Sequence, residues 1–239
     1  MIKNNIAANE RCIIALDVPD NTTALQLVDT LSDVAAFYKI GLELFAAGVG
    51  RGLLDTLVAQ QKKVFVDLKL YDVPETVARA TRQVAASGAN FLTVHGDEAI
   101  MQAAVANKGE RLKILAVTAL TSLDEQGLKQ LGYRGSMRDF VLEKAQRAQA
   151  AGCDGVICSG LEVAMLREQL GDDFILVTPG IRQQSDAAGD QKRIATPAAV
   201  MAAGGDYLVI GRPVRDAAQP KQTLAQIVTE VETAVAARG

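Results

Sequence analysis

The sequence has few of the residues that build most metal and redox sites. Its 239 residues include one histidine, three cysteines and no tryptophan. A single histidine, His95, excludes a multi-histidine metal centre. The cysteines Cys12, Cys153 and Cys158 form no C-x-x-C pair and lie near apolar runs, as is typical of reduced core thiols in a cytoplasmic protein. We therefore expect no metal site and no cofactor.

Net positive charge and long apolar runs are also missing. The net charge of −3 offers no basic surface for nucleic acid or for an anionic membrane. No apolar run approaches the roughly 18 residues that a membrane-spanning helix needs, and residues 1–10 lack the apolar stretch of a signal peptide. These absences predict a cytoplasmic protein that binds neither nucleic acid nor membrane.

Short apolar runs rich in β-branched residues alternate with longer segments of helical periodicity. Pro74 is expected to open one helix, and Ser136 with Asp139 resembles the capping box of another, which ends at Gly152. This alternation, without a linker, predicts a single-domain (β/α)8 TIM barrel over residues 1–239. A doubly wound open sheet is the alternative, but no G-x-G-x-x-G follows the first strand. The predicted strands are residues 12–18, 37–42, 64–70, 91–96, 112–120, 155–160, 174–180 and 207–212.

The third predicted strand carries charges that a buried strand normally lacks. Asp67 and Lys69 are two residues apart and so share one face of the strand, and Asp72 follows just beyond it. Lys39 and Asp17 lie near the ends of the two earlier strands. Because catalytic residues of a barrel lie at the carboxyl ends of its strands, we expect a catalytic ionic cluster there. A purely structural salt-bridge network is the alternative, although buried ion pairs are poor stabilisers.

A glycine and an arginine follow each of the last two predicted strands. These residues are Gly180 with Arg182, and Gly211 with Arg212. A glycine lets backbone N–H groups approach an anion closely, and an arginine adds bidentate hydrogen bonds. Barrels of this class commonly bind phosphate at this position, so we expect a phosphate group as part of the ligand.

The polar segment 182–197 lies between these two pairs. Loops longer than about 12–15 residues in compact domains are usually functional or disordered. We expect this one to close over the ligand phosphate, with Gln191 as a contact; an ordinary solvated loop is the alternative. His95 fits a hydrogen-bonded structural residue better than a catalytic base. For Thr121 and Ser122 the sequence leaves helix capping and ligand binding open.

The stretch DLKLYDVPET, residues 67–76, resembles the D-x-K-x-x-D-[IV]-P-x-T signature of the orotidine 5′-monophosphate decarboxylase family. The similarity runs along the chain through IIALD, YKIG, AVTALTS, VTPGIR and IGR. D-x-K-x-x-D alone is shared with related phosphosugar decarboxylases and aldolase-like synthases, whereas the full set of motifs is specific. Val73 stands where the signature also allows isoleucine, with no chemical consequence.

The resemblance implies a homodimer that converts orotidine 5′-monophosphate to uridine 5′-monophosphate and CO₂ without a cofactor, in pyrimidine biosynthesis. Lys69 would stabilise and protonate the C6 carbanion, beside Asp67 and Lys39 of the same subunit. Asp72 and Thr76 would reach in from the other subunit. The implied substrate contacts are Asp17 and Lys39 at the ribose, Thr121 at the pyrimidine, and Arg182, Gln191, Gly211 and Arg212 at the phosphate.

Two other functions stay open on the sequence alone. One is a metal-dependent phosphosugar decarboxylase or synthase of the same superfamily, whose activity a chelator would remove. The other is a non-catalytic barrel that binds a phosphorylated ligand, although binding alone would not need Lys69 between two aspartates.

Overall fold

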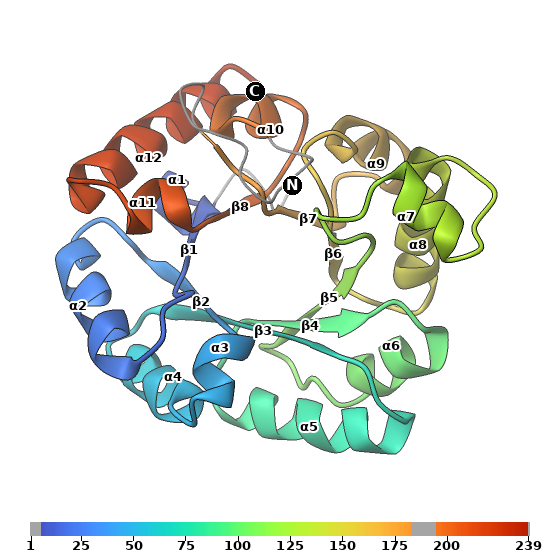
Figure 1. Ribbon diagram of the computed structural model, residues 1–239, viewed down its shortest axis with the longest axis horizontal. Coiled ribbons are helices and arrows are strands. Elements are labelled where there is room, and N and C mark those ends of the chain that lie inside the picture. Colours follow the sequence, from blue (N-terminus) through green and yellow to red (C-terminus); the bar gives the residue numbers. More distant parts are fainter. Residues whose placement is uncertain (1–5, 183–194, 239) are drawn as a thin grey trace.

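The computed structural model of the protein describes residues 6–182 and 195–238. Within these residues, parallel strands form a closed barrel in which each strand pairs with the next in sequence and β8 pairs with β1 (Figure 1). This closure confirms the (β/α)8 prediction and rules out the open doubly wound sheet. The strands are β1 Cys12–Ala15, β2 Phe37–Gly41, β3 Lys63–Leu70, β4 Phe91–His95, β5 Lys113–Val117, β6 Gly155–Ile157, β7 Ile175–Thr178 and β8 Tyr207–Ile210.

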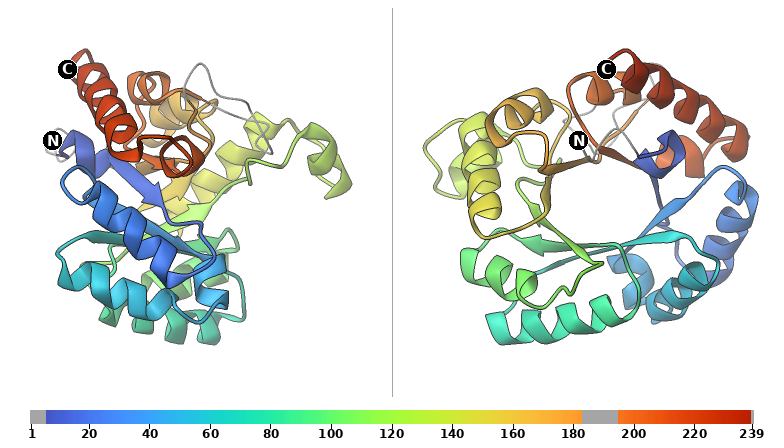
Figure 2. Two further views of the ribbon diagram at one scale, coloured as in Figure 1. Left: turned by 60° about the vertical axis from the view of Figure 1, so that its left-hand side comes forward. Right: turned by 180° about the vertical axis from the view of Figure 1, so that it is seen from behind.

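Helices surround the barrel on the outside, as the views from two sides show (Figure 2). Pro74 opens α5 and Gly152 follows the end of α8, whose capping box joins Ser136 and Asp139, all as predicted. The helices are α1 Ala8–Arg11, α2 Asn21–Leu31, α3 Leu42–Ala46, α4 Gly50–Ala59, α5 Pro74–Ala86, α6 Glu98–Val105, α7 Glu125–Gln130, α8 Met137–Ala150, α9 Val163–Leu170, α10 Pro197–Ala202, α11 Arg212–Arg215 and α12 Pro220–Ala236.

Alternation along the strands divides the barrel interior into two layers. Near the amino ends of the strands, Phe37, Phe65, Phe91 and Tyr207 pack ring against ring, with centroids 5.0–6.0 Å apart. These aromatic side chains fill the lower part of the barrel. Side chains two residues further along each strand point inward again, because successive residues face opposite sides. The polar side chains of β2, β3 and β4 therefore lie above an apolar plug, at the carboxyl end.

Several strands end earlier than the sequence predicts. Residues 16–18, 118–120 and 158–160 were expected in strands, but they follow the ends of β1, β5 and β6. Most of these residues are still buried, as Leu16, Ala119 and Cys158 are, so the apolar pattern extends past the strand ends. Asp17 therefore lies in a loop at the mouth rather than within β1.

Candidate active site

A cavity of about 610 Å³ lies at the carboxyl ends of the strands. Its floor is apolar and is formed by side chains from β1, β3, β5, β6 and β8. Around this floor stand acidic, basic and hydroxyl side chains from the strand ends and the loops that follow them. A volume in this range suits a small-molecule ligand. The apolar floor residues are Ala15, Phe65, Val117, Ile157 and Val209.

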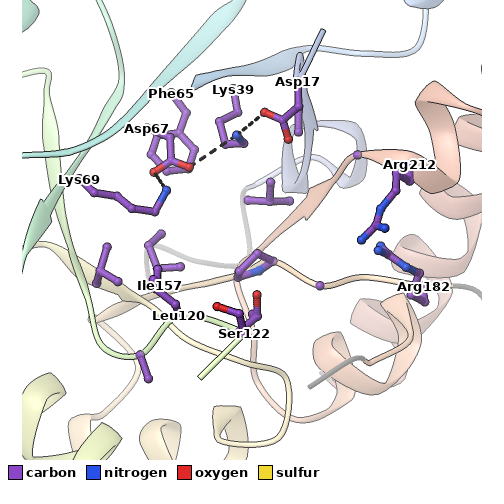
Figure 3. A pocket seen from close by; sticks show the side chains of 18 of the residues that line it. Asp17, Lys39, Phe65, Asp67, Lys69, Leu120, Ser122, Ile157, Arg182 and Arg212 are labelled. Atoms are coloured by element: carbon purple, nitrogen blue, oxygen red, sulfur yellow. Dashed lines mark hydrogen bonds and ion pairs between the residues drawn. The ribbon is translucent and has the colours of Figure 1, made fainter. Parts of the chain in front are cut away.

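Lys39, Asp67, Lys69 and Asp17 form a connected ionic cluster on one wall of the cavity (Figure 3). Lys69 Nζ donates to Asp67 Oδ1 at 2.9 Å. Lys39 Nζ lies 3.5 Å from Asp67 Oδ2 and donates to Asp17 Oδ1 at 2.9 Å. Lys39 is buried, with 7% of its surface exposed, and these two carboxylates are its ion-pair partners. The cluster thus holds two cations beside a shared carboxylate.

Local distortion of β3 presents Lys69 to the cavity. The pairing of β3 with β4 is regular at Val66 and resumes at Leu70, with an irregularity between them. Lys69 itself has a φ of 48°, in the left-handed region. For a residue with a Cβ this conformation costs about 1–2 kcal/mol, and it persists only where surrounding contacts impose it. The faces predicted for Asp67 and Lys69 are correct, but the strand that carries them is irregular.

Thr93 on β4 links the two charged residues of β3. Its hydroxyl donates to Asp67 Oδ1 at 2.8 Å and accepts from the backbone N–H of Lys69 at 2.9 Å. The side chain of Thr93 is fully buried. Sequence reasoning missed this residue, although Thr93 is a polar residue two positions after Phe91 and therefore shares its inward face.

The electrostatics of the cluster favour an ionised Asp67. Burial by itself raises the pKa of Asp67, but the charges of Lys39 and Lys69, with hydrogen bonds from Lys69 and Thr93, lower that pKa below its ordinary value of 3.8. At neutral pH the carboxylate is therefore charged. It balances the two ammonium groups and accepts hydrogen bonds that orient one of them.

Arginines line the opposite side of the cavity from Lys69. The guanidinium groups of Arg182 and Arg212 lie next to each other on this side (Figure 3). Arg182 is buried, with 6% of its surface exposed, and its Nη1 donates to the carbonyl of Ile181 at 2.8 Å. Gly180, with a φ of 78°, and Gly211 line the same region. Two arginines beside accessible backbone form an arrangement suited to a phosphate group.

Most of the predicted site residues line this one cavity. They are Asp17, Lys39, Asp67, Lys69, Thr121, Arg182, Gly211 and Arg212. Ser122 lines it as well. Gln191 lies outside the described residues, as does most of the segment 182–197. At its ends, Ile181 and Ala195 form a parallel bridge, so the described flanks lie side by side.

Asp72 and Thr76 are not among the residues that line the cavity of their own chain. Asp72 is exposed, and its Oδ1 accepts a hydrogen bond from the N–H of Val73 at 2.6 Å. The expectation that Asp72 joins the ionic cluster within a single chain is therefore not met. The loop after β3 carries Asp72 outward because Pro74 starts α5 two residues later.

Two further residues escaped sequence reasoning. A Cβ at Gly41 would lie 3.2 Å from Lys39 Nζ and 3.4 Å from Asp17 Oδ1, so the glycine leaves room for that ion pair. Arg215 lines the cavity, donates to the backbone carbonyl of Asp17 at 2.7 Å and forms a bidentate pair with Asp216. It ties the loop after β1 to α11. Neither role has a local sequence signal, because both depend on segments far apart in the chain.

His95 and the cysteines are not members of the ionic cluster. His95 packs edge-on against the ring of Tyr71, with centroids 5.2 Å apart, and burial together with Lys144 and Lys69 lowers its pKa. Burial raises the pKa of Cys12, Cys153 and Cys158 to about 12, so these thiols stay protonated. Neither the histidine nor a cysteine lines the cavity.

Residues 6–182 and 195–238 have neither a metal-binding cluster nor a membrane-spanning helix. They contain no group of three or more histidine, cysteine, aspartate or glutamate side chains placed to hold a metal ion. In the same part of the chain, no helix combines the length and the apolar character that crossing a bilayer would require.

Comparison with known proteins gives a consistent result. Residues 10–227 match the model of the family described as orotidine 5′-phosphate decarboxylase / HUMPS. A protein of Methylococcus capsulatus named orotidine 5′-phosphate decarboxylase is 48% identical over 97% of this chain and 96% of its own length. One of the same name from Afipia carboxidovorans is 51% identical over 94% of this chain and 96% of its own.

Solved structures agree with the sequence comparisons. The crystal structure of orotidine 5′-phosphate decarboxylase from Lactobacillus acidophilus superposes with a TM-score of 0.81 at 35% identity, covering 92% of this chain and 98% of that one. An uncharacterized conserved protein from Geobacillus kaustophilus gives a TM-score of 0.80 at 33% identity, over 92% of this chain and 99% of its own. The chain belongs to the orotidine 5′-phosphate decarboxylase / HUMPS family.

Proposed function

We propose that this enzyme decarboxylates orotidine 5′-monophosphate to uridine 5′-monophosphate in pyrimidine biosynthesis, without a cofactor. The observation that carries the proposal is the position of Lys69, whose ammonium is hydrogen-bonded to Asp67 inside a cavity with two arginines on its far side. The relatives at about 50% identity bear the name of this activity. The buried free thiols fit a cytoplasmic enzyme.

In the proposed reaction the bond between C6 and the carboxylate breaks and its electron pair stays on C6. CO₂ leaves, and a proton moves from Lys69 Nζ to C6; solvent later restores the lysine proton. The carbanion forms in an orbital that the ring cannot readily delocalise, so a nearby positive charge is the direct way to stabilise it. Unit charges about 4 Å apart interact by roughly 4 kcal/mol at an effective dielectric near 20. That gain corresponds to about three powers of ten in rate.

Asp67 serves in this proposal to hold the ammonium of Lys69 in place. Its low pKa keeps it charged at neutral pH, so the hydrogen bond to Lys69 is charge-assisted. Lys39 neutralises part of the same carboxylate and binds Asp17, and we assign Asp17 and Lys39 to the ribose hydroxyls. Thr121, on the loop after β5, is assigned to the pyrimidine.

Arg182 and Arg212, with Gly211, are assigned to the substrate phosphate, together with Gln191 from the segment outside the described residues. The arginines lie on the opposite side of the cavity from Lys69, so a bound nucleotide would extend from one to the other. Phosphate binding at a distance from the reacting carbon contributes by fixing its position against Lys69. We also propose that the segment 182–197 closes over this phosphate.

We further propose a homodimer in which Asp72 and Thr76 of the partner subunit complete each site. Asp72 is flanked by two exposed apolar side chains, Tyr71 at 68% and Val73 at 63% exposure, and Leu42 on α3 is 60% exposed. Large apolar side chains so exposed are typical of a surface that a partner covers. An acidic residue among them would be carried into the neighbouring subunit.

Mixing two inactive variants tests this arrangement. A dimer of one Lys69→Met and one Asp72→Ala subunit contains one site with both substitutions and one site with neither. Random reassociation of equal amounts should therefore restore about one quarter of wild-type activity. If Asp72 served its own chain, every site of the mixed dimer would keep one substitution and activity would not return.

Following the ultraviolet absorbance of orotidine 5′-monophosphate with purified protein tests the function itself. We expect complete conversion to uridine 5′-monophosphate, unchanged after dialysis against a chelator. Loss of activity on chelation would instead favour a metal-dependent phosphosugar decarboxylase or synthase. Binding of uridine 5′-monophosphate without turnover of orotidine 5′-monophosphate would indicate a non-catalytic barrel that binds a phosphorylated ligand.

A further inference from the structure

We infer that Thr93 is a positioning residue for this reaction, whose hydroxyl sets both the carboxylate of Asp67 and the backbone of Lys69. The inference rests on the proposed function and extends it to a residue outside the assigned substrate contacts. Thr93 is not among the residues that line the cavity, so it acts through the two charged residues of β3 rather than on the substrate.

The register between β3 and β4 explains why a side chain is needed at this point. Val66 pairs with Leu92 and Leu70 pairs with Val94, so three residues of β3 lie opposite Thr93 alone. The backbone of β4 therefore offers too few partners to continue the ladder through the irregularity. The N–H of Lys69 donates instead to the hydroxyl of Thr93, at 2.9 Å. A side chain thus replaces a missing backbone acceptor.

The same hydroxyl also uses its single hydrogen as a donor. A threonine hydroxyl has one hydrogen to donate, and Thr93 donates it to Asp67 Oδ1 at 2.8 Å. That oxygen also accepts from Lys69 Nζ at 2.9 Å. Thr93, Asp67 and Lys69 therefore form a closed ring of hydrogen bonds, from hydroxyl to carboxylate to ammonium and back through the backbone of Lys69.

This ring accounts for the unusual backbone of Lys69. A residue with φ of 48° needs contacts that hold it there, and the bond from its N–H to Thr93 is one that the structure shows. Without the hydroxyl, β3 could relax toward a regular strand, which would move Nζ relative to the cavity. Small displacements of a catalytic group are costly, because rate depends steeply on near-attack geometry.

Substitutions at Thr93 test the inference against a matched control. Thr93→Val keeps the shape and removes the hydroxyl, Thr93→Ser keeps the hydroxyl, and Thr93→Cys offers only a weak donor and acceptor. The control is Thr118→Val, since Thr118 is 5% exposed and its hydroxyl donates to the carbonyl of Ile157 at 2.8 Å. The hydroxyl makes two hydrogen bonds at Thr93 and one at Thr118, and only Thr93→Val loses contact with the charged pair.

We expect kcat to fall at least about tenfold in Thr93→Val, with the KM and the dissociation constant of uridine 5′-monophosphate within about threefold of wild type. Thr93→Ser should recover most of kcat, and Thr93→Cys should lie between them. Three results would overturn the inference: an unchanged kcat in Thr93→Val, an equal fall of kcat in Thr118→Val, or a kcat in Thr93→Ser as low as that of Thr93→Val. If the valine variant does not fold, the serine and cysteine variants decide it by the same criterion.

Acid unfolding separates this inference from the proposed function. Loss of the hydroxyl should raise the pKa of Asp67 toward its ordinary value, so the acid midpoint of Thr93→Val should lie at higher pH than that of Thr118→Val. This measurement needs no substrate. If the wild-type protein fails to release CO₂, the proposed function is wrong, and the acid midpoint still reports whether Thr93 holds Asp67. Equal acid-unfolding midpoints in Thr93→Val and Thr118→Val would show that Thr93 does not lower the pKa of Asp67.

Discussion

Two aspartates in this barrel each lie between two lysines, at opposite ends of the strands. Asp67, near the carboxyl end of β3, contacts Lys39 and Lys69. Asp154, just before β6, contacts Lys108 and Lys113. The two carboxylate side chains are equally buried, at 14% and 12% exposure. Composition and burial alone therefore cannot tell the two clusters apart.

The other partners of each carboxylate make the difference. Asp154 Oδ2 accepts the backbone N–H of Ile114 at 2.9 Å, so this cluster joins the start of β6 to β5. It does not line the cavity. Asp67 instead accepts from Thr93 and lines the cavity together with both of its lysines. One aspartate and two lysines thus connect strands at one end of the barrel and, in our proposal, take part in catalysis at the other.

Replacing one lysine in each cluster should give the largest contrast. We expect Lys69→Met to lower kcat by at least about 10³-fold, because the charge that stabilises the carbanion is lost. Binding of uridine 5′-monophosphate should stay within a few fold. Lys113→Met, the control, should keep wild-type turnover. Equal loss of turnover and product binding in Lys69→Met would show a structural lysine instead.

Neutralising the two aspartates should affect different properties, turnover for Asp67 and stability for Asp154. Asp67→Asn should lower kcat by about 10²-fold or more, because the ammonium of Lys69 loses its charged acceptor. Asp154→Asn should keep its activity but lose about 1.5–3 kcal/mol in the free energy of unfolding, since it weakens hydrogen bonds to a charged group. Steady-state kinetics and urea unfolding of both variants give the comparison. Similar profiles for the two would mean that both clusters are structural.

The arginine side of the cavity should respond through binding. Arg212→Ala should weaken binding of uridine 5′-monophosphate by about 10–100-fold, as expected for lost hydrogen bonds to a charged group. Binding of uridine, which has no phosphate, should not change. Arg138→Ala, on the exposed surface of α8, serves as the control. Unchanged nucleotide affinity in Arg212→Ala would contradict the phosphate assignment.

The pH dependence of stability should distinguish Asp67 from an unperturbed carboxylate. Its pKa is lowered in the folded protein, so its stabilising contribution is present above the ordinary value of 3.8 and is lost as pH falls through the folded pKa. The difference in unfolding free energy between wild type and Asp67→Asn should therefore be constant between about pH 7 and pH 5 and change below about pH 4. A difference that changes already near pH 6 would contradict the direction of the shift.

The smallest effect is expected at Gly41. A methyl group there would crowd the pair of Lys39 and Asp17, so Gly41→Ala should raise KM by about twofold to tenfold. Gly52→Ala is the control, because a Cβ at that position in α4 meets nothing within 4 Å. This control should keep its activity and gain up to about 1 kcal/mol in stability. Equal kinetics in both variants would show that the ion pair tolerates the contact.

Local sequence determined a large share of the architecture. Pro74 at the start of α5, the capping box of Ser136 and Asp139, and the alternation of strands and helices act within a few residues, so they could be interpreted without the fold. The period of two along β3 predicted that Asp67 and Lys69 both face inward, and both line the cavity. The motif in residues 67–76 added the family, which the comparisons confirm.

Tertiary structure decided what depends on neighbouring strands. The irregularity that leaves Lys69 with a left-handed φ, and the hydroxyl of Thr93 that fills it, exist only because β3 and β4 lie side by side in one register. Closure of the barrel likewise brings Arg212, after β8, to the cavity that Asp17 enters from β1. Hydrogen-bond geometry and charge separation are properties of distances between segments, and a linear pattern does not encode those distances until the chain has folded.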